Sequence, residues 1–365
     1  MAVARGPPYR KPLSRWIWWT LIANRRWLVL AAGALLIAGC AETVSSASPD
    51  APITLRIGLF PNLTHAPALV AVNKGMFSAA LGNNVTLETH TFNSGPEAVT
   101  AILSDSIDAS FMGPNPTTNA YLQSHGSAIR VIAGSTSGGA LLVVKSSIES
   151  ITALKGTRIA DPQLGSTQDI ALRWFLKSHG LTSELAGGGD VAVIPQDNSQ
   201  TLSAFRQGQI DGAWVPEPWA SRLIVEGGAR VLVDERDLWP EGKFATTNLV
   251  VRTNFLRAHQ KQVQALIEGL YQVIEYLNSS QDEARQAATD AVTQITGKKL
   301  ANGIVSSAWA HMAFGLDPLA SSLKASADHA HSLGLLPLAD LKGLYDLTIV
   351  NNVLRGHGQP TVSGL

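Results

Sequence analysis

Short polar loops, and not a set of catalytic residues, are the parts of this chain that could do chemistry. They follow segments that read as buried strands, and most of them directly precede segments that read as helices. The first N–H groups of a helix lack partners within it, so they and the helix dipole favour a small anionic group. The residues singled out in this way are Asn62, Thr64, His65, Asn93, Ser94, Gly95, Asn115, Thr117, Ser135, Thr136, Ser137, Gln163, Ser166, Thr167, Gln168, Gln196, Asp197, Asn198, Glu217 and Trp219.

Each of these loops also has an ordinary structural interpretation, because Ser, Thr, Asn and Asp commonly cap helix N-termini. For a single loop, capping is the simpler explanation. A polar loop repeated at the same position in two halves of the chain favours a binding cleft instead. Neutral donors in such a cleft would suit an oxyanion without a lysine.

Glu217 is the most unusual of these residues, since it lies between Pro216 and Pro218. A carboxylate at an anion site would repel a bare oxyanion, but it could accept a hydrogen bond from a ligand ammonium or hydroxyl group. The alternative is an exposed or internally paired acid on a rigid turn. Trp219 could form a wall of the pocket, whereas Trp214 is expected in the core.

Residue patterns typical of enzymes are missing from the sequence. The nine histidines are scattered without metal-ligand spacing, and the serines of Gly134–Gly138 do not match a nucleophile elbow. Gly187–Gly189 precedes a strand and not a helix, so it fails the context test for phosphate binding. We therefore expect no enzyme activity, no catalytic residue, no bound metal and no cofactor.

Two stretches about a hundred residues apart repeat one pattern. Ala101, Ile107 and Asp108 match Ala204, Ile210 and Asp211 at a constant offset of 103 residues, and each copy continues into a short apolar run closed by Pro-x-Pro. Each copy reads as a helix end, a tight turn, a buried strand and a loop. In an open α/β sheet, ligands bind beyond the carboxyl ends of the strands, so two such lobes facing each other would form a cleft.

The surrounding segments predict an α/β fold of two similar lobes with Rossmann-like β-α-β grammar, followed by C-terminal helices. Residues 113–118 and 135–137 read as loops, and 247–252 reads as a return strand that pairs near 141–144 to give a two-strand hinge. The apolar stripe of Gln260–Leu277 predicts a packed helix, and 338–354 reads as a last helix. The domains expected are lobe I, 53–138 and 249–365 with the C-terminal helices, and lobe II, 139–248.

The first 52 residues read as a leader and a tether. Trp27–Gly39 is an uncharged run of 13 residues, too short to span a bilayer but suited to a signal peptide over residues 1–39. Cys40, the only cysteine, follows small residues as in a bacterial lipobox, which predicts its lipidation; a core cysteine is the alternative. Residues 40–52 are expected to form a flexible tether. Six basic and no acidic residues precede position 40, so the remainder carries about −6, which argues against nucleic-acid binding.

Several motifs in this order resemble the substrate-binding proteins of ABC importers for aliphatic sulfonates, taurine and nitrate. They are the lipobox, Phe60–Pro67, Gly75–Phe77, Ser94–Pro96, Gly113–Pro116, Leu154–Gly156 and Ile210–Trp219. The resemblance covers about residues 53–280 and implies a type II periplasmic-binding fold that encloses its ligand between two closing lobes. The ligand-binding loops it implies are Asn62–His65, Ser94–Gly95, Asn115, Ser135–Ser137, Gly165–Thr167 and Glu217.

The resemblance also implies partners and a location: an ABC permease with its ATPase subunit, and a lipid-anchored monomer on the extracytoplasmic side of a bacterial membrane. An alkanesulfonate or taurine is favoured as ligand, because neutral donors fit a sulfonate and Glu217 could accept from the taurine ammonium. Nitrate, bicarbonate and pyrimidine or flavin precursors remain alternatives. A pyrimidine-synthesis enzyme or a sensor on the same fold are the rival classes.

Overall fold

A computed structural model describes residues 52–365 of the chain. The predicted signal peptide, the lipidation at Cys40 and all but the last residue of the predicted tether lie outside this part. Across residues 52–365, none of the helices combines the length and the apolar character needed to cross a membrane.

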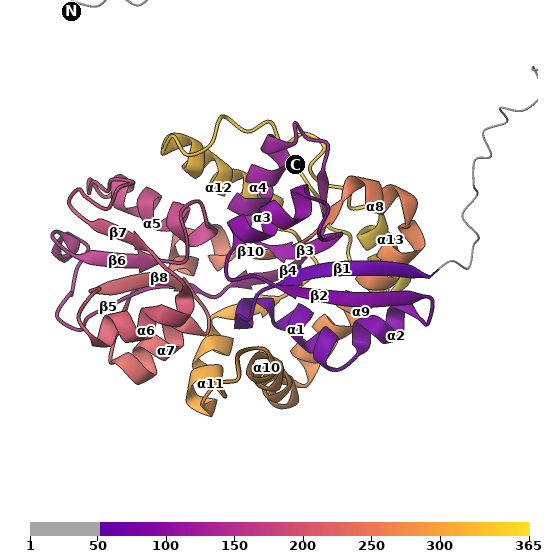
Figure 1. The fold of residues 1–365 in the computed structure, drawn as a ribbon, viewed down its shortest axis with the longest axis horizontal. Helices are drawn as coiled ribbons and strands as arrows, with labels where there is room; N and C mark the ends of the chain where they lie inside the picture. Colours follow the sequence, from indigo (N-terminus) through magenta and orange to yellow (C-terminus); the bar gives the residue numbers. More distant parts are fainter. Residues whose placement is uncertain (1–51) are drawn as a thin grey trace, which may run out of the picture. The chain divides into compact units, whose positions relative to one another are not determined.

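Two β-sheets organise these residues, which confirms the predicted α/β class (Figure 1). Sheet A has the order β11-β4-β10-β3-β1-β2, and sheet B has the order β7-β6-β8-β5-β9. The strands of sheet A are β1 Ile53–Leu59, β2 Val85–Thr91, β3 Ala109–Met112, β4 Ile129–Gly138, β10 Ala245–Arg252 and β11 Met312–Phe314. Those of sheet B are β5 Ala140–Val144, β6 Arg158–Asp161, β7 Ala192–Pro195, β8 Gly212–Pro216 and β9 Arg230–Asp234.

Helices cover both faces of each sheet, as a mostly parallel sheet requires. Lobe I is sheet A with the helices α1 Ala66–Asn73, α2 Met76–Leu81, α3 Gly95–Leu103, α4 Pro114–Gln123, α8 Thr253–Ala258, α9 Gln260–Ser279, α10 Gln281–Thr296, α11 Asn302–Ala310, α12 Ala320–Ser332 and α13 Thr348–Gly356. Lobe II is sheet B with α5 Thr167–Ser178, α6 Asn198–Arg206 and α7 Trp219–Gly227. In Figure 1, lobe II lies on the left and lobe I on the right.

The hydrophobic core of lobe I has two parts, one on each face of sheet A. Leu55, Ile57 and Leu59 point from β1 to the face covered by α1, α2 and α9. The opposite face packs under α3, α4 and α12. The stripe predicted on α9 is confirmed, because Leu266, Leu270 and the other aliphatic members of the stripe are buried against sheet A.

The strand pairing predicted for 247–252 is wrong. β10 pairs with β3 and β4 in sheet A, whereas β5, which contains 141–144, pairs with β8 and β9 in sheet B. Each sheet therefore has one antiparallel strand next to the strand that follows its repeated Ile-Asp pair: β10 beside β3 in sheet A, and β5 beside β8 in sheet B. The chain passes from sheet A to sheet B at Gly138–Gly139, where both residues have positive φ that glycine adopts without strain, and returns through residues 235–244.

Three other local predictions also differ from the structure. Residues 135–137 belong to β4, which extends to Gly138 because β10 and β11 pair along it. Residues 114–118 belong to α4, since Pro114 occupies the first helical turn, where its missing N–H has no cost. The predicted helix at 338–354 is confined to α13, and the segment before Thr348 is irregular apart from one bridge at Tyr345.

The repeated aspartates anchor the two sheets in the same way. Asp108 Oδ2 accepts from the Arg56 backbone N–H at 3.0 Å, and Asp211 Oδ2 accepts from the Arg158 N–H at 2.9 Å. Each carboxylate also pairs with that arginine and with a cation on the antiparallel strand, Arg252 on β10 or Lys145 next to the end of β5. The Asp in each repeat is therefore a structural clip that joins three strands.

Replacing Asp108 with Asn should lower the free energy of unfolding by about 2 kcal/mol, because Arg56 and the 16% exposed Arg252 lose a buried counter-ion. Urea denaturation of the purified chain measures this. Asp211→Asn is the matched comparison and should cost less than about 1 kcal/mol, since Lys145 and Arg158 are 37% and 45% exposed. Equal losses in the two variants would contradict the clip at Asp108.

Candidate functional site

A cavity lies between the two lobes, at the carboxyl ends of the parallel strands. About 410 Å³ of space that protein atoms do not fill lies within it and in the open solvent at its mouth. Lobe I contributes the loop after β1, the start of α3 and part of β10, and lobe II contributes the start of α5. The lining residues are Phe60, Asn62, Thr64, His65, Asn93, Ser94, Gly95, Gly113, Pro116, Pro162, Ser166, Thr167, Gln168, Asn198, Pro216, Thr246 and Thr247.

His65 is a neutral hydrogen-bond donor at this cavity. Burial lowers the pKa of His65 to about 3, so the imidazole is uncharged at neutral pH. Its Nδ1 accepts from the Phe60 backbone N–H at 3.4 Å, and the Phe60 and His65 rings lie with centroids 4.4 Å apart and planes tilted by 34°. With Nδ1 accepting, the ring proton lies on Nε2 and is available to a ligand.

Two helix N-termini from different lobes meet at the cavity. α3 begins at Gly95 and α5 begins at Thr167, and both residues line the space. Ser166 is an ordinary cap, because its Oγ accepts from the Asp169 N–H at 3.3 Å. Ser94 does not cap α3; its hydroxyl donates instead to Gln163 Oε1 of lobe II. The capping alternative therefore applies to one of these loops and not to the other.

The lobes are closed around the cavity. Besides the Ser94–Gln163 contact, Trp219 Nε1 donates to Asn62 Oδ1 across the lobes at 2.7 Å. Gly113 lies so near Thr167 that a Cβ at Gly113 would be 2.3 Å from Thr167 Oγ1. Glycine at the start of α4 therefore permits the close approach of lobe II.

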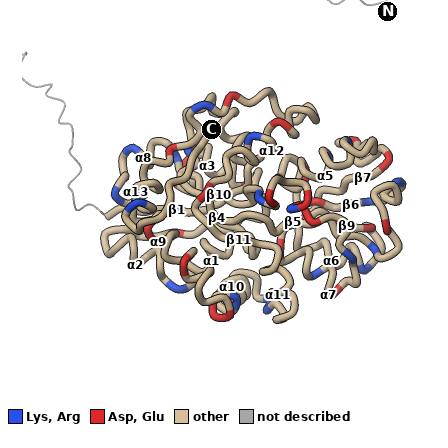
Figure 2. Tube along the Cα trace, turned by 180° about the vertical axis from the view of Figure 1, so that it is seen from behind, with Lys and Arg blue, Asp and Glu red and all other residues tan. Residues whose placement is uncertain are grey.

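The cavity lining contains no Lys, Arg, Asp or Glu. Charged residues of both signs are instead scattered over both lobes, as Figure 2 shows for residues 52–365. The polar groups that face the cavity are hydroxyls, amides, one neutral imidazole and the N–H groups of the helix starts. Such a lining can hold an anion through donors and dipoles, and it offers no counter-charge to a ligand cation.

Seven of the predicted site residues line this cavity, and the other seven do not. The first group is Asn62, Thr64, His65, Ser94, Gly95, Ser166 and Thr167. The second group is Asn115, Ser135, Thr136, Ser137, Gly165, Glu217 and Trp219. Trp219 nevertheless contacts a lining residue, because its Nε1 donates to Asn62. Gly165 lies behind the lining, where its backbone N–H donates to Asp169 Oδ2 at 2.8 Å.

Asn115 and the polar residues of β4 serve the packing of lobe I. Asn115 lies on α4 and exchanges hydrogen bonds with Ser326 of α12, to which it donates at 3.0 Å and from which it accepts at 2.6 Å. Ser137 accepts from the Phe244 N–H. Ser135 and Thr136 are buried hydroxyls with no hydrogen-bond partner in the described part of the chain. None of the three β4 residues lines the cavity.

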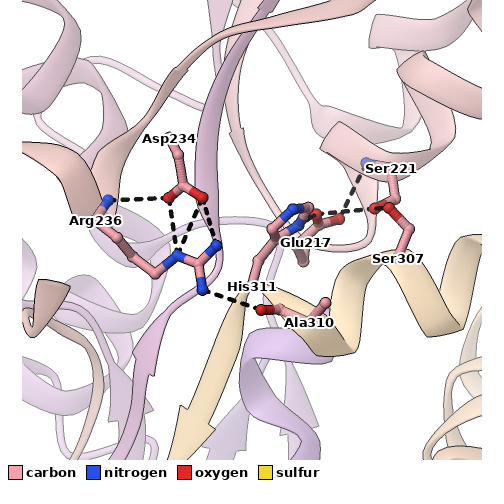
Figure 3. A network of polar contacts seen from close by, with 7 residues as sticks. All are labelled: Glu217, Ser221, Asp234, Arg236, Ser307, Ala310 and His311. Carbon is pink, nitrogen blue, oxygen red and sulfur yellow. Dashed lines mark hydrogen bonds and ion pairs between the residues drawn. The ribbon is translucent and has the colours of Figure 1, made fainter.

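Glu217 is fully buried in a polar network away from the cavity (Figure 3). Its carboxylate accepts from the Ser221 N–H at 3.0 Å and from the Ser221 hydroxyl at 2.9 Å, and His311 Nδ1 lies 2.7 Å from Oε1. The Ser221 hydroxyl also meets Ser307 of α11. Glu217 thus joins α7 to α11. It matches the alternative of an internally paired acid, and its burial outside the cavity lining gives no support to the expectation that it accepts from a ligand ammonium.

Sequence reasoning missed Thr246 and Thr247 of β10. Thr246 donates its hydroxyl to Gly138 O, and Thr247 donates to Thr64 O at 3.1 Å. The sequence places Thr247 at the start of the predicted hinge strand 247–252 and assigns no role to Thr246, so it gives no reason to expect either residue at the site. Asn93, Gln168 and Asn198, which the sequence predicts to be polar loop residues, all line the cavity.

A buried acid pair lies behind the lobe II wall. Arg173 Nε donates to Asp169 Oδ1 at 2.6 Å, while neither oxygen of the nearby Asp161 has a donor within the described residues. Burial, followed by the charge of Asp169, raises the pKa of Asp161 well above its ordinary value. Asp161 therefore holds a proton more readily than an exposed aspartate does, whereas Asp169 ties the loop that carries Ser166 through the Gly165 N–H and the Ser166 hydroxyl.

Residues 52–365 contain no cluster of three or more His, Cys, Asp or Glu side chains that could hold a metal ion. A buried Glu235 has its pKa raised to about 7 by desolvation, but it accepts from Trp214 Nε1 at 2.8 Å inside lobe II and does not line the cavity. The arrangement described here is suited to binding a small solute.

The neutral His65 should make stability depend on pH. Its folded-state pKa lies below the unfolded value of 6.5, so stability falls as pH falls from 6.5 toward 3, by about 2 kcal/mol at pH 5. Urea denaturation at pH 7 and pH 5 should show a smaller loss for His65→Gln than for the native chain. The exposed His331→Gln is the control and should behave as the native chain does; a native pH dependence in His65→Gln would contradict the assignment.

Comparisons with known proteins agree with this fold. A Bacillus subtilis (strain 168) protein, provisionally named for aliphatic sulfonate binding, is 25% identical over 338 residues, 90% of this chain and 97% of the relative. The taurine-binding periplasmic protein of Escherichia coli (strain K12) is 29% identical over 203 residues, 56% of this chain and 60% of the relative.

Two solved structures share the fold at low identity. The alkanesulfonate-binding protein SsuA from Xanthomonas axonopodis pv. citri, bound to MOPS, has a TM-score of 0.68 at 21% identity over 82% of this chain and 99% of that one. The desulfurization enzyme DSZB has a TM-score of 0.61 at 19% identity over 84% and 99%. A model of the NMT1-like family matches residues 48–293, more than half of the sequence, and the chain therefore belongs to the NMT1-like family.

Proposed function

We propose that this protein is the extracytoplasmic solute-binding component of an ABC importer and that it captures a small organic anion, an aliphatic sulfonate, between its lobes. The observation that carries the proposal is the closed cavity lined by neutral donors from both lobes. The relatives named for sulfonate and taurine binding support the same class of ligand.

A sulfonate fits the polarity of the lining. Its three oxygens accept hydrogen bonds in several directions, and the cavity presents donors from several directions, among them His65 Nε2 and the helix starts at Gly95 and Thr167. Because the lining holds no cation, binding does not require a buried ion pair to be desolvated. Phe60 and Pro162 supply apolar surface for a short alkyl chain.

An alkanesulfonate without an amine fits better than taurine. The ammonium group of taurine would need an acceptor of negative charge, and no carboxylate lines the cavity. Glu217, the residue expected to supply a carboxylate, is buried outside the lining and contacts Ser221 and His311. Nitrate is the second candidate, since it needs the same donors and less space.

Capture would proceed by lobe closure. A ligand that contacts α3 and α5 together gains those contacts only in the closed form, so it shifts an open–closed equilibrium by its differential affinity. The closed form then presents both lobes to a membrane permease, whose ATPase subunit drives release. The duplicated scaffold supplies the two surfaces that such a permease would bind.

An enzyme on the same fold is the rival class, because a desulfurization enzyme is among the structural neighbours. The cavity lining contains no cysteine, and His65 is its only imidazole. No serine or threonine hydroxyl of the lining is hydrogen-bonded to His65, whose Nδ1 is taken by the Phe60 N–H. This favours reversible binding over a chemical step.

A leader and lipid anchor complete the proposal. Residues 1–39 would direct export, Cys40 would be lipidated and residues 40–52 would tether the lobes to the membrane as a monomer. The basic residues and the apolar run before Cys40 support this assignment.

Ethanesulfonate should stabilise the purified chain, by about 2.7 kcal/mol when its concentration is a hundred times Kd. A thermal-shift series with ethanesulfonate, taurine, nitrate and an aminopyrimidine measures the order of affinity, which we expect to be led by ethanesulfonate. A shift with the pyrimidine alone would overturn the ligand class. Mass spectrometry of each ligand after incubation tests the enzyme alternative, which a chemically altered ligand would support.

Thr167→Val should weaken ethanesulfonate binding about tenfold or more, because a hydroxyl at the start of α5 is lost while the shape of the side chain is kept. Isothermal titration calorimetry measures this. Thr100→Val is the matched control. Thr100 is exposed on α3 and does not line the cavity, so this variant should bind ethanesulfonate with native affinity. Unchanged affinity in Thr167→Val would place the ligand elsewhere.

Mass spectrometry of the protein purified from bacterial membranes should show a chain that begins at a lipid-modified Cys40. Cys40→Ser should release the protein from the membrane fraction while leaving its ligand affinity unchanged. A mature chain that retains residues 1–39 without lipid would contradict the anchor and leave the binding proposal standing.

A further inference from the structure

One hydrogen bond between the lobes fixes how a cavity residue presents itself to the ligand. Trp219 Nε1 donates to Asn62 Oδ1 at 2.7 Å, from the start of α7 in lobe II to the loop after β1 in lobe I. The indole ring has one N–H donor and no acceptor. Its partner atom must therefore be the carbonyl oxygen of the Asn62 amide, which turns the amide NH₂ group to the other side.

The NH₂ group of Asn62 faces the cavity. Asn62 lines this space and is only 5% exposed. Its Nδ2 makes no hydrogen bond within residues 52–365, and it is not one of the fully enclosed polar atoms that lack a partner. The atom must then retain contact with the open space beside it, which is the cavity. Asn62 thus presents its amide NH₂ group to the cavity as a donor, while its amide oxygen is bound to Trp219.

Trp219 is held in place by lobe II itself. It is the first residue of α7, and the Arg222 guanidinium lies 5.3 Å from the centre of its ring. Arg222 is in turn paired with Glu226 at 3.1 Å. Trp219 therefore has support within its own lobe that does not depend on Asn62.

We propose that Trp219 is a positioning residue for ligand selection: closure brings its N–H to Asn62, locks the amide with NH₂ toward the cavity, and so admits a ligand that accepts a hydrogen bond there while rejecting one that donates. This rests on the proposed solute-binding function and deepens it. A ligand N–H at this point could be satisfied only by turning the Asn62 oxygen inward, and the amide NH₂ would then face the indole N–H, donor against donor.

The selection can be measured with two ligands of nearly the same shape. Ethanesulfonate is an anion that offers only acceptors, whereas the neutral ethanesulfonamide has an NH₂ donor in place of one oxygen; the charge difference is the same for every variant, so a change in the affinity ratio between variants reports on the donor. The native chain should prefer ethanesulfonate. In Trp219→Phe the amide can rotate, so affinity for ethanesulfonate should fall about tenfold and the preference over ethanesulfonamide should shrink by a similar factor. Isothermal titration calorimetry with both ligands gives the ratio.

Two further variants separate positioning from general damage. Asn62→Asp keeps an acceptor for Trp219 but turns a carboxylate oxygen to the cavity, so ethanesulfonate affinity should fall by about a hundredfold or more through charge repulsion. Trp174→Phe is the matched control, since Trp174 also lies between the lobes, stacked on His329, but its indole N–H makes no hydrogen bond within residues 52–365. Its ligand ratio should remain native. A ratio unchanged in Trp219→Phe, or lowered equally in Trp174→Phe, would overturn the proposal.

A readout without ligand distinguishes failure of this inference from failure of the proposed function. In ¹⁵N NMR spectra the Trp219 indole N–H, assigned by its loss in Trp219→Phe, should be protected from hydrogen exchange in the native chain and in Asn62→Asp, and exposed in Asn62→Leu. If neither sulfur ligand binds but this protection is present, the clamp stands and the ligand class is wrong. If the indole N–H exchanges as freely as an exposed one, the clamp itself is wrong.

Discussion

Backbone N–H groups that have no partner inside their own helices are the constraint on which this site depends. α3 and α5 both begin at the cavity, and each exposes N–H groups that water satisfies while the lobes are apart. Closing the lobes removes most of that water, so the donors need another acceptor. An anion that reaches both helix starts meets this need from both sides, which ties ligand capture to closure.

The neutrality of the lining follows from the same constraint. A lysine or arginine in so closed a space would be costly to bury without a fixed counter-ion, whereas hydroxyls, amides and the uncharged His65 are not. Charges close to the site are paired among themselves behind its wall. Asp169 with Arg173 supports the α5 loop in lobe II, and Glu217 with His311 joins α7 to α11. Charged side chains thus stabilise the structure behind the cavity, and neutral hydrogen-bond donors line the cavity itself.

The two lobes share a scaffold but use it differently. Asp108 and Asp211 clip equivalent strands in equivalent ways. At the helix starts the symmetry ends, because Ser166 caps its own helix whereas Ser94 reaches across to the other lobe. The strands are thus anchored alike in both sheets, whereas the loops differ where the two lobes meet.

Local sequence pattern was enough to predict the two α/β lobes, the strands that follow the repeated Ile-Asp pairs, the packed stripe of α9 and the loops that hold Asn62, Ser94 and Ser166. This is because the periodicity of strands and helices and the residue preferences at helix starts depend on a few neighbouring residues. The tertiary structure alone decided which sheet β10 joins, that Thr246 lines the cavity, and that Asn115 and Glu217 do not. Their partners lie far along the chain, at Ser326 and His311. A hydrogen bond or strand pairing over such separations leaves no periodic trace in the sequence, so only the packed fold shows which polar groups are already satisfied and which remain free for a ligand.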